Sequence, residues 1–344
     1  MSTLDKICKD SASTKSNYDT CEVSDMLNLK DISMVDKDND IPVCANCGKE
    51  GDDVNNICNK CKTVKYCNAS CKKKHRHKHK KDCEEHVRLA AERAAELHDE
   101  ELFKQSPSQY GDCPICFIRI KTLVSGRTYY ACCGKMICCG CAYAPRYDNQ
   151  GNKVDSVKQN ECPFCRTPHH TSNEEMVKRM KKRVQAHDPI AIYNIGVYYR
   201  DGTNGYPQDY TKALELFHRA DGYTIAYASV GYAYDNGDGV EVDKEKAIYY
   251  YELAAMRGVA GARHNLGLHE QKASNMDRAL KHFMIAVRGG YSDSLEHIKI
   301  LYSNGLASKE DYTKALRSYQ TYLSEIKSAQ RDKAAAVDEE YQYY

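Results

Sequence analysis

The distribution of cysteine constrains this chain more than any other feature of its sequence. All eighteen cysteines lie at or before Cys165 in a chain of 344 residues, and most of them form pairs separated by two residues. Disulfides are rare in reducing compartments, and cysteine pairs at this spacing are typical of metal ligands. The sequence therefore predicts a metal-stabilised first half and a second half of a different kind.

Two further observations bear on the compartment. No stretch approaches the roughly 18 consecutive apolar residues of a membrane helix, and the first residues, MSTLDKICKDSASTK, lack the apolar region of a secretory signal. We therefore expect a cytoplasmic or nuclear protein with no membrane contact. A secreted disulfide scaffold is the disfavoured alternative. The formal net charge of +2 disfavours nucleic-acid binding through overall positive charge.

Three segments lie outside the expected domains. Residues 1–43 are rich in Ser, Asp, Lys and Asn, which predicts a disordered arm. Residues 84–108 place apolar side chains on one face at helical spacing and then contain a Ser-Pro-Ser stop, which predicts a helical linker. Residues 328–344 are assigned to a C-terminal tail.

Residues 188–327 repeat a pattern of small residues. Ala191, Ala226, Ala262 and Ser294 recur at intervals of 35, 36 and 32, and a second set follows at Ala213, Ala247, Ala279 and Ala315. Small residues at fixed positions let two helices approach closely, while Tyr and Leu fill the space between successive pairs. We expect an α-solenoid of about four helix pairs.

These units resemble Sel-1-like repeats, relatives of the tetratricopeptide repeat. The second unit carries most of the family pattern, including the loop Gly237-Asp238-Gly239-Val240, whereas the fourth has Lys299 at the glycine position. The resemblance implies a surface that binds proteins and has no chemistry of its own; a solenoid that only spaces the fingers is the alternative.

The first cysteine cluster has eight ligand-type side chains in forty residues: Cys44, Cys47, Cys58, Cys61, Cys67, Cys71, His79 and Cys83. Eight such ligands are enough for two tetrahedral zinc ions. A stretch this short cannot bury much apolar surface, so bound metal would replace a core.

The eight-ligand spacing is similar to that of the MYND zinc finger, a protein-binding module that often takes proline-containing peptides. The resemblance implies interleaved ligands, with Cys44, Cys47, Cys67 and Cys71 on one zinc and Cys58, Cys61, His79 and Cys83 on the other. The basic run at residues 72–81 is either a solvated helix face, which we favour, or a nuclear import signal. Because no aromatic side chains are interleaved with it, nucleic acid is an unlikely partner.

The second cluster reads Cys113-Pro-Ile-Cys116, Cys133-Gly-Lys-Met-Ile-Cys138-xx-Cys141 and Cys162-Pro-Phe-Cys165-Arg166. Its order and spacing resemble those of a RING finger over residues 113–166, within an expected domain at residues 109–170. The resemblance implies one zinc on Cys113, Cys116, Cys138 and Cys141, and a second on Cys133, Cys162 and Cys165. Lys135 stands where the family has a histidine and cannot bind metal while charged. The fourth ligand of the second zinc is therefore left open. Cys132 is favoured over His169 and His170, and Cys139 is not needed for either zinc.

RING ligases position a charged ubiquitin-conjugating enzyme and form no covalent intermediate. The resemblance implies that Ile115 and Pro163 dock this enzyme, that Arg166 bridges it to ubiquitin, and that Tyr143 adds a bulky contact. The alternative is that these residues only pack loops or face solvent.

The sequence thus predicts a multidomain protein with two zinc-stabilised fingers followed by an all-α solenoid. The preferred function is a RING-type ubiquitin-protein ligase whose other modules recruit protein partners. A non-enzymatic adaptor is the alternative, and a nuclear regulator recruited through the MYND finger is a third interpretation.

Overall fold

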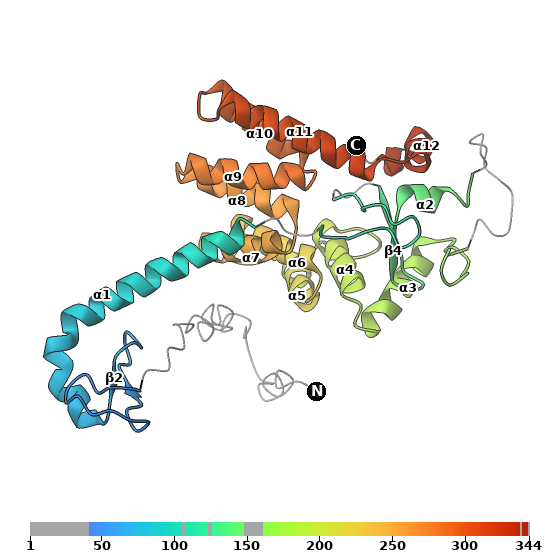
Figure 1. The fold of residues 1–344 in the computed structure, drawn as a ribbon. Coiled ribbons are helices and arrows are strands. Elements are labelled where there is room, and N and C mark those ends of the chain that lie inside the picture. Colours follow the sequence, from blue (N-terminus) through green and yellow to red (C-terminus); the bar gives the residue numbers. More distant parts are fainter. Residues whose placement is uncertain (1–40, 105–107, 123–125, 148–160, 338, 343–344) are drawn as a thin grey trace. The chain divides into compact units, whose positions relative to one another are not determined.

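A computed structural model describes residues 41–104, 108–122, 126–147, 161–337 and 339–342. Nearly all of the predicted arm at 1–43 lies outside them. The chain divides into two compact units, Met1–His98 and Asp99–Tyr344 (Figure 1). None of the described helices combines the length and apolar composition needed to span a lipid bilayer.

The described part of the first unit has a small antiparallel sheet and the start of a long helix. Strands β1 (Asn56–Ile57) and β2 (Lys65–Tyr66) pair, and helix α1 runs from Ala69 to Leu102. The buried cluster consists largely of cysteines, with Val54 and Tyr66. This composition agrees with a fold held by metal rather than by an apolar core.

Helix α1 joins the predicted finger helix and the predicted linker into one element of 34 residues. No Gly or Pro occurs between Ala69 and Gln105, so nothing in the sequence ends the helix earlier. Arg88 also pairs with Glu85 and Glu92 at helical spacing. The last residues of α1 belong to the second unit, where Leu102 is fully buried.

The second unit begins with a small finger. Strands β3 (Arg127–Tyr130) and β4 (Lys135–Cys138) form an antiparallel hairpin, and the short helix α2 (Cys139–Tyr143) follows. Ile120, Tyr130 and Ile137 are buried together with cysteines. Helix α3 (Asn173–Gln185) then leads into the solenoid, with the side chain of Ser172 capping its first turn.

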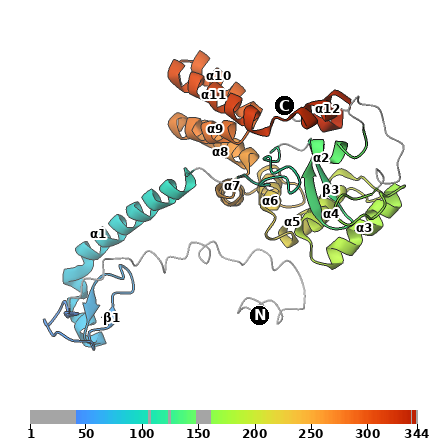
Figure 2. The same cartoon turned by 45° about the vertical axis from the view of Figure 1, so that its right-hand side comes forward.

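Four helix pairs form the solenoid (Figure 2). They are α4 (Pro189–Asp201) with α5 (Tyr210–Arg219), α6 (Thr224–Asn236) with α7 (Lys244–Met256), α8 (Ala260–Lys272) with α9 (Met276–Arg288), and α10 (Ser292–Ser303) with α11 (Lys309–Ile326). Helix α12 (Ala329–Val337) and a 3₁₀ turn, η4 (Glu339–Tyr341), follow.

The repeated small residues lie where the helices touch. The eight positions named in the sequence are all at most 2% exposed. In the first three pairs a helical glycine also faces an aromatic ring of the partner helix, because Gly196, Gly231 and Gly267 meet Phe217, Tyr251 and Phe283. A Cβ built on these glycines would lie 2.7, 2.8 and 2.5 Å from the ring. In the fourth pair Lys299 takes this position and faces solvent, paired with Glu296.

The finger of the second unit is bound firmly to the solenoid. The Tyr129 hydroxyl donates to Asp188, 2.8 Å away, whose carboxylate also caps the first turn of α4. Near the other end, the Thr122 hydroxyl donates to the carbonyl of Gly289 at 2.6 Å, and the Thr122 amide donates to the Tyr322 hydroxyl. Finger and solenoid therefore share one compact unit.

Within residues 328–344, assigned from the sequence to a C-terminal tail, the described part folds and packs on the finger. Helix α12 packs against α2 of the finger, and Arg331 is only 1% exposed. Its guanidinium donates to the carbonyls of Ile118, Arg119 and Ile326, at 3.1, 2.8 and 2.7 Å. The first two carbonyls lie more than 200 residues earlier in the sequence, so helical periodicity alone could not reveal the contact.

Candidate metal centres

Among the described residues, cysteine and histidine side chains gather in four groups of four. These are Cys44, Cys47, Cys67 and Cys71; Cys58, Cys61, His79 and Cys83; Cys113, Cys116, Cys138 and Cys141; and Cys132, Cys133, Cys162 and Cys165. Within each group the ligand atoms all lie within 4.8 Å of one another.

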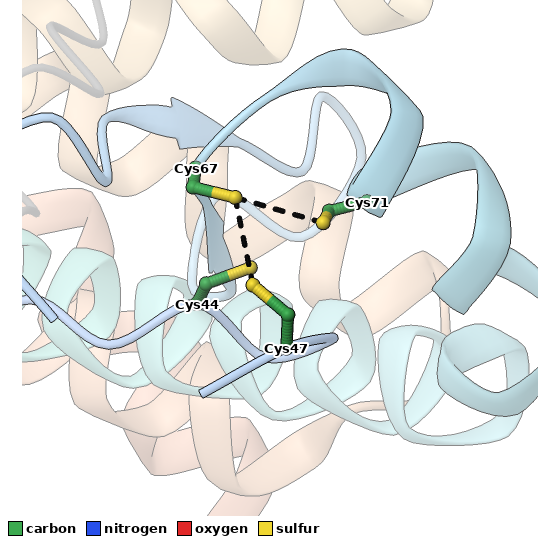
Figure 3. A group of neighbouring side chains, drawn as sticks. All are labelled: Cys44, Cys47, Cys67 and Cys71. Carbon is green, nitrogen blue, oxygen red and sulfur yellow. Dashed lines mark hydrogen bonds between the residues drawn. The ribbon is translucent and has the colours of Figure 1, made fainter. Parts of the chain in front are cut away.

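The first group shows the geometry most directly (Figure 3). The sulfur of Cys67 lies 3.6 Å from that of Cys47 and 3.6 Å from that of Cys71. Zn–S bonds of about 2.3 Å in a tetrahedron give sulfur–sulfur edges of about 3.8 Å, whereas a disulfide bond is only about 2.05 Å long. The separations therefore fit a tetrahedral metal ion and exclude a disulfide.

The second group mixes thiols with an imidazole. The sulfurs of Cys58 and Cys83 are 3.7 Å apart, and the Cys61 sulfur lies 3.4 Å from Nε2 of His79. A zinc site with one nitrogen ligand has a sulfur–nitrogen edge of about 3.6 Å, so this group also fits. The structure thus brings the eight predicted residues together in the two interleaved sets that the MYND resemblance implies.

One backbone geometry recurs at four of the cysteine pairs. The residue that follows the second cysteine of the pair is left-handed, with φ between 56° and 73° at Gly48, Lys62, Phe117 and Arg166. Each of these residues donates its amide to the carbonyl of the first cysteine, at 2.8 to 3.0 Å. The resulting tight turn points both sulfurs of a pair to one side, as a shared metal ion requires.

The third group lies in the finger of the second unit. The sulfurs of Cys116 and Cys138 are 3.7 Å apart, and the amide of Cys138 points at the sulfur of Cys113 at 3.5 Å. Hydrogen bonds from the Cys138 thiol and from backbone amides lower the pKa of Cys113 to about 4 despite its burial. A thiolate is thus favoured at Cys113, while the pKa of Cys138 is raised chiefly by its hydrogen bond to Cys113. Zinc binding at this group would therefore release protons.

The fourth group places a cysteine at the position of the ligand that the sequence left open. Cys132 joins Cys133, Cys162 and Cys165, and the sulfurs of Cys133 and Cys162 are 3.6 Å apart. A tight turn after β3, with Gly134 at φ 74°, turns the chain back at these adjacent cysteines. None of the four groups includes His169 or His170.

Lys135 and Cys139 both lie outside the metal groups. Lys135 is exposed at the start of β4. Cys139 is fully buried against Tyr322 and Ile326 of α11, so it serves in packing.

The predicted docking residues separate into two kinds. Ile115 is 41% exposed, and Pro163 and Arg166 are exposed as well. Tyr143, in contrast, is 3% exposed and stacks on Tyr147 with ring centroids 4.3 Å apart. The expectation that Tyr143 adds a docking contact was therefore wrong.

Two exposed aromatic side chains beside the docking residues were not among the residues predicted from the sequence. Phe117 is 78% exposed and Phe164 is 37% exposed. Each lies inside or directly after a CxxC pair, and this position in the sequence could have predicted that the side chain is exposed.

Two family models match parts of the chain. The MYND finger matches residues 44–83, and the Sel1 repeat matches residues 189–220 and 224–259. The third and fourth helix pairs lie beyond the matched repeats.

Individual relatives are more distant. The ERAD-associated E3 ubiquitin-protein ligase component HRD3B of Arabidopsis thaliana is 27% identical over 110 residues, which span 32% of this chain and 17% of that protein. A Sel1 repeat protein from Oxalobacter formigenes is 29% identical, with a TM-score of 0.39, over 44% of this chain and 64% of its own. The protective antigen c5321 of uropathogenic Escherichia coli, which has an SLR fold, is 24% identical, with a TM-score of 0.38, over 48% and 36%.

The chain thus spans less than two thirds of each of these relatives, and about a sixth of the plant protein. The ligand geometry of the first unit and the glycine–aromatic contacts of the helix pairs agree with the family matches. The chain therefore contains a MYND zinc finger at residues 44–83 and Sel1 repeats within residues 189–259.

Proposed function

We propose that this protein is a RING-type ubiquitin-protein ligase that acts in the cytoplasm or nucleus. In this proposal residues 109–170 form a variant RING finger that docks a charged ubiquitin-conjugating enzyme. The observation that carries the proposal is the pair of interleaved four-cysteine groups in this finger, next to exposed Ile115, Pro163 and Arg166. Zinc would hold the two loops that present these residues, with two ions in this finger and two in the MYND finger.

The chemistry asked of the finger is positioning. Ile115, Phe117 and Phe164 offer apolar surface to the conjugating enzyme, and such exposed apolar groups are typical of binding sites. Arg166 lies in the left-handed turn directly after Cys165, and its planar guanidinium can donate to two proteins at once. Holding the thioester in one reactive arrangement accelerates transfer without any covalent step on this chain.

The other modules would recruit protein partners. MYND fingers and Sel1 repeats generally mediate protein–protein interaction. On the solenoid, a groove of about 240 Å³ lies over α5, α6 and α8 and includes Tyr210, Tyr232 and Asn265. Tyr232 is half exposed there, which suits a surface that binds peptides.

A non-enzymatic adaptor is the second candidate. It is favoured by the burial of Tyr143 under the C-terminal segment, where the Tyr341 ring meets it edge-on at 6.3 Å. The presence of Lys135 at the usual histidine position points the same way.

Ubiquitin discharge from a panel of charged conjugating enzymes tests the proposal. The zinc-loaded full chain is expected to accelerate discharge, and Ile115→Ala and Arg166→Ala are each expected to abolish the acceleration. Ile300→Ala is the matched control, because Ile300 is similarly exposed at 48% but lies on α10 of the solenoid. No discharge with any enzyme of the panel would favour the adaptor.

A further inference from the structure

A cavity of about 260 Å³ lies within the second unit, between the finger and the first solenoid helices. Its walls come from β3 and the turn that follows, from residues 167–170, and from helices α3 and α4. This volume is just below the roughly 300–1,000 Å³ of sites that hold drug-sized ligands. The cavity can therefore hold a group about the size of one amino-acid residue.

Four basic side chains line this cavity: Arg146, His169, His170 and Arg179. None of the described residues that line it is an Asp or a Glu. The pKa of His169 is lowered by burial and by the positive charges of Arg146, His170 and Arg179. The charges are thus close enough to repel one another, and an anion in the cavity would relieve that repulsion.

The two arginines keep donors for a ligand. Arg146 donates through Nη1 to the Tyr341 hydroxyl at 3.1 Å, and its Nη2 lies 3.4 Å from His169. Arg179 donates through Nη1 to the carbonyl of Pro168 at 2.6 Å and pairs through Nη2 with Glu175. Because a guanidinium has five N–H groups, these contacts among the described residues leave further N–H donors on each arginine.

The charge balance favours a ligand with one negative charge. Glu175 offsets Arg179, and the lowered pKa of His169 favours its neutral form, so Arg146 supplies the excess positive charge. A doubly charged phosphate would exceed this balance, whereas a carboxylate matches it.

Thr128, Thr167, Asn194 and Cys132 also line the cavity, and one part of the wall is apolar and aromatic. Met176 and Met180 contribute from α3, and Tyr130 and Tyr198 add aromatic rings. The Tyr198 hydroxyl donates to the sulfur of Met176 at 3.3 Å, so this polar end is already satisfied. Such a wall suits an apolar body attached to the anionic group.

We propose that this cavity binds a carboxylate attached to an apolar group of single-residue size, either a small free acid or the C-terminal residue of a peptide. The proposal does not depend on ligase activity. It adds a binding site at the junction of finger and solenoid, where Arg146 and Arg179 hold the carboxylate and the Met and Tyr side chains hold the apolar body.

Calorimetric titration of the zinc-loaded full chain tests this site. The probes are N-acetyl-leucine, N-acetyl-leucinamide, inorganic phosphate, and a pentapeptide that ends in leucine with either a free or an amidated C-terminus. The free carboxylates are expected to bind and their amides are not, because only the former match the arginines. If the pentapeptide with a free C-terminus binds more tightly than N-acetyl-leucine, the ligand is the end of a peptide chain. If N-acetyl-leucine binds more tightly, the ligand is a small acid.

Two variants locate the binding. Arg146→Gln is expected to weaken carboxylate affinity at least about tenfold, the lower end for losing a hydrogen bond between charged groups. Asn194→Asp is expected to do the same by adding a negative charge to the α4 wall without removing a cation. Lys178→Gln is the matched control, since Lys178 lies on α3 but does not line the cavity.

Zinc content and thermal unfolding of each variant establish that it is folded. Equal binding of acid and amide, stronger binding of phosphate, or unchanged affinity in both cavity variants would overturn the proposal. The discharge assay measures ubiquitin transfer and not carboxylate binding, so these outcomes are independent of it.

Discussion

Replacing a glycine of α8 by alanine is expected to have opposite effects at two positions of the same helix. Alanine in place of glycine stabilises a helix by up to about 1 kcal/mol. At Gly261 a new Cβ would be 3.4 Å from the nearest atom, on Tyr291, which is ordinary contact. Gly261→Ala should therefore stabilise the helix pair by up to about 1 kcal/mol.

At Gly267 the same change meets a fully buried ring. The new Cβ would lie 2.5, 2.7 and 3.0 Å from three atoms of Phe283, whereas carbon atoms normally approach only to about 3.5 Å. Phe283 is held between His264 and His297, with ring centroids 5.6 and 5.1 Å away, so it has little room to move. Overpacking costs about 1–3 kcal/mol. With the upper end of this range and the helix gain subtracted, Gly267→Ala should destabilise the pair by about 2 kcal/mol.

Amide hydrogen exchange, read in peptides from α8 and α9, measures this difference locally. A loss of about 2 kcal/mol corresponds to roughly thirtyfold faster exchange, because 1.4 kcal/mol is a factor of ten. Gly267→Ala combined with Phe283→Leu should recover part of the protection. If both single variants changed exchange in the same direction, the view that helix approach requires Gly267 would be refuted.

Three further predictions concern the metal groups, α12 and pH. Native mass spectrometry should find four zinc ions per chain, fewer in Cys132→Ala, and still four in Cys139→Ala. Arg331→Met should speed exchange at residues 113–122, because the hydrogen bonds to the carbonyls of Ile118 and Arg119, of about 1 kcal/mol or more each, are lost; Arg331→Lys, which lacks the planar fork, should behave alike. Burial, and then the charge of His297, lowers the pKa of His264 to about 4. As the pH falls, this histidine therefore takes up its proton in the unfolded chain before it does so in the folded chain. The stability of the solenoid should then fall between pH 6.5 and 4, by up to about 3 kcal/mol. Exchange in α8 should show this fall, and His264→Gln should reduce it, leaving the part due to buried His282 on α9, whose pKa burial lowers to about 3.

Sequence spacing predicted the local parts of this molecule well. Spacing identified the pairs of ligand-type side chains, and the MYND and RING resemblances implied how the pairs combine into sets of four. The helix pairs follow from alanines at fixed positions such as Ala226 and Ala262. Both patterns are local, because metal binding and the packing of neighbouring helices depend on the spacing of residues that are close in the sequence.

Contacts between distant segments were not predictable from spacing. Helix α12 looks like a tail because its partner, α2, lies nearly 200 residues earlier, and Tyr143 looks exposed until Tyr341 covers it. The same contacts join α12 to the finger. Chelation should loosen α12 as well as the fingers, because Arg331 binds carbonyls within the finger.

The left-handed turns after the cysteine pairs have a consequence for how the proposed ligase activity is measured. A non-glycine residue in this conformation is disfavoured by roughly 1–2 kcal/mol, and Lys62, Phe117 and Arg166 all adopt it. A bound metal ion would hold the turn closed against this preference, and the free chain would tend to release it. The direction of the Arg166 side chain is then a property of the metallated protein, so a preparation depleted of zinc would look inactive even with every side chain intact.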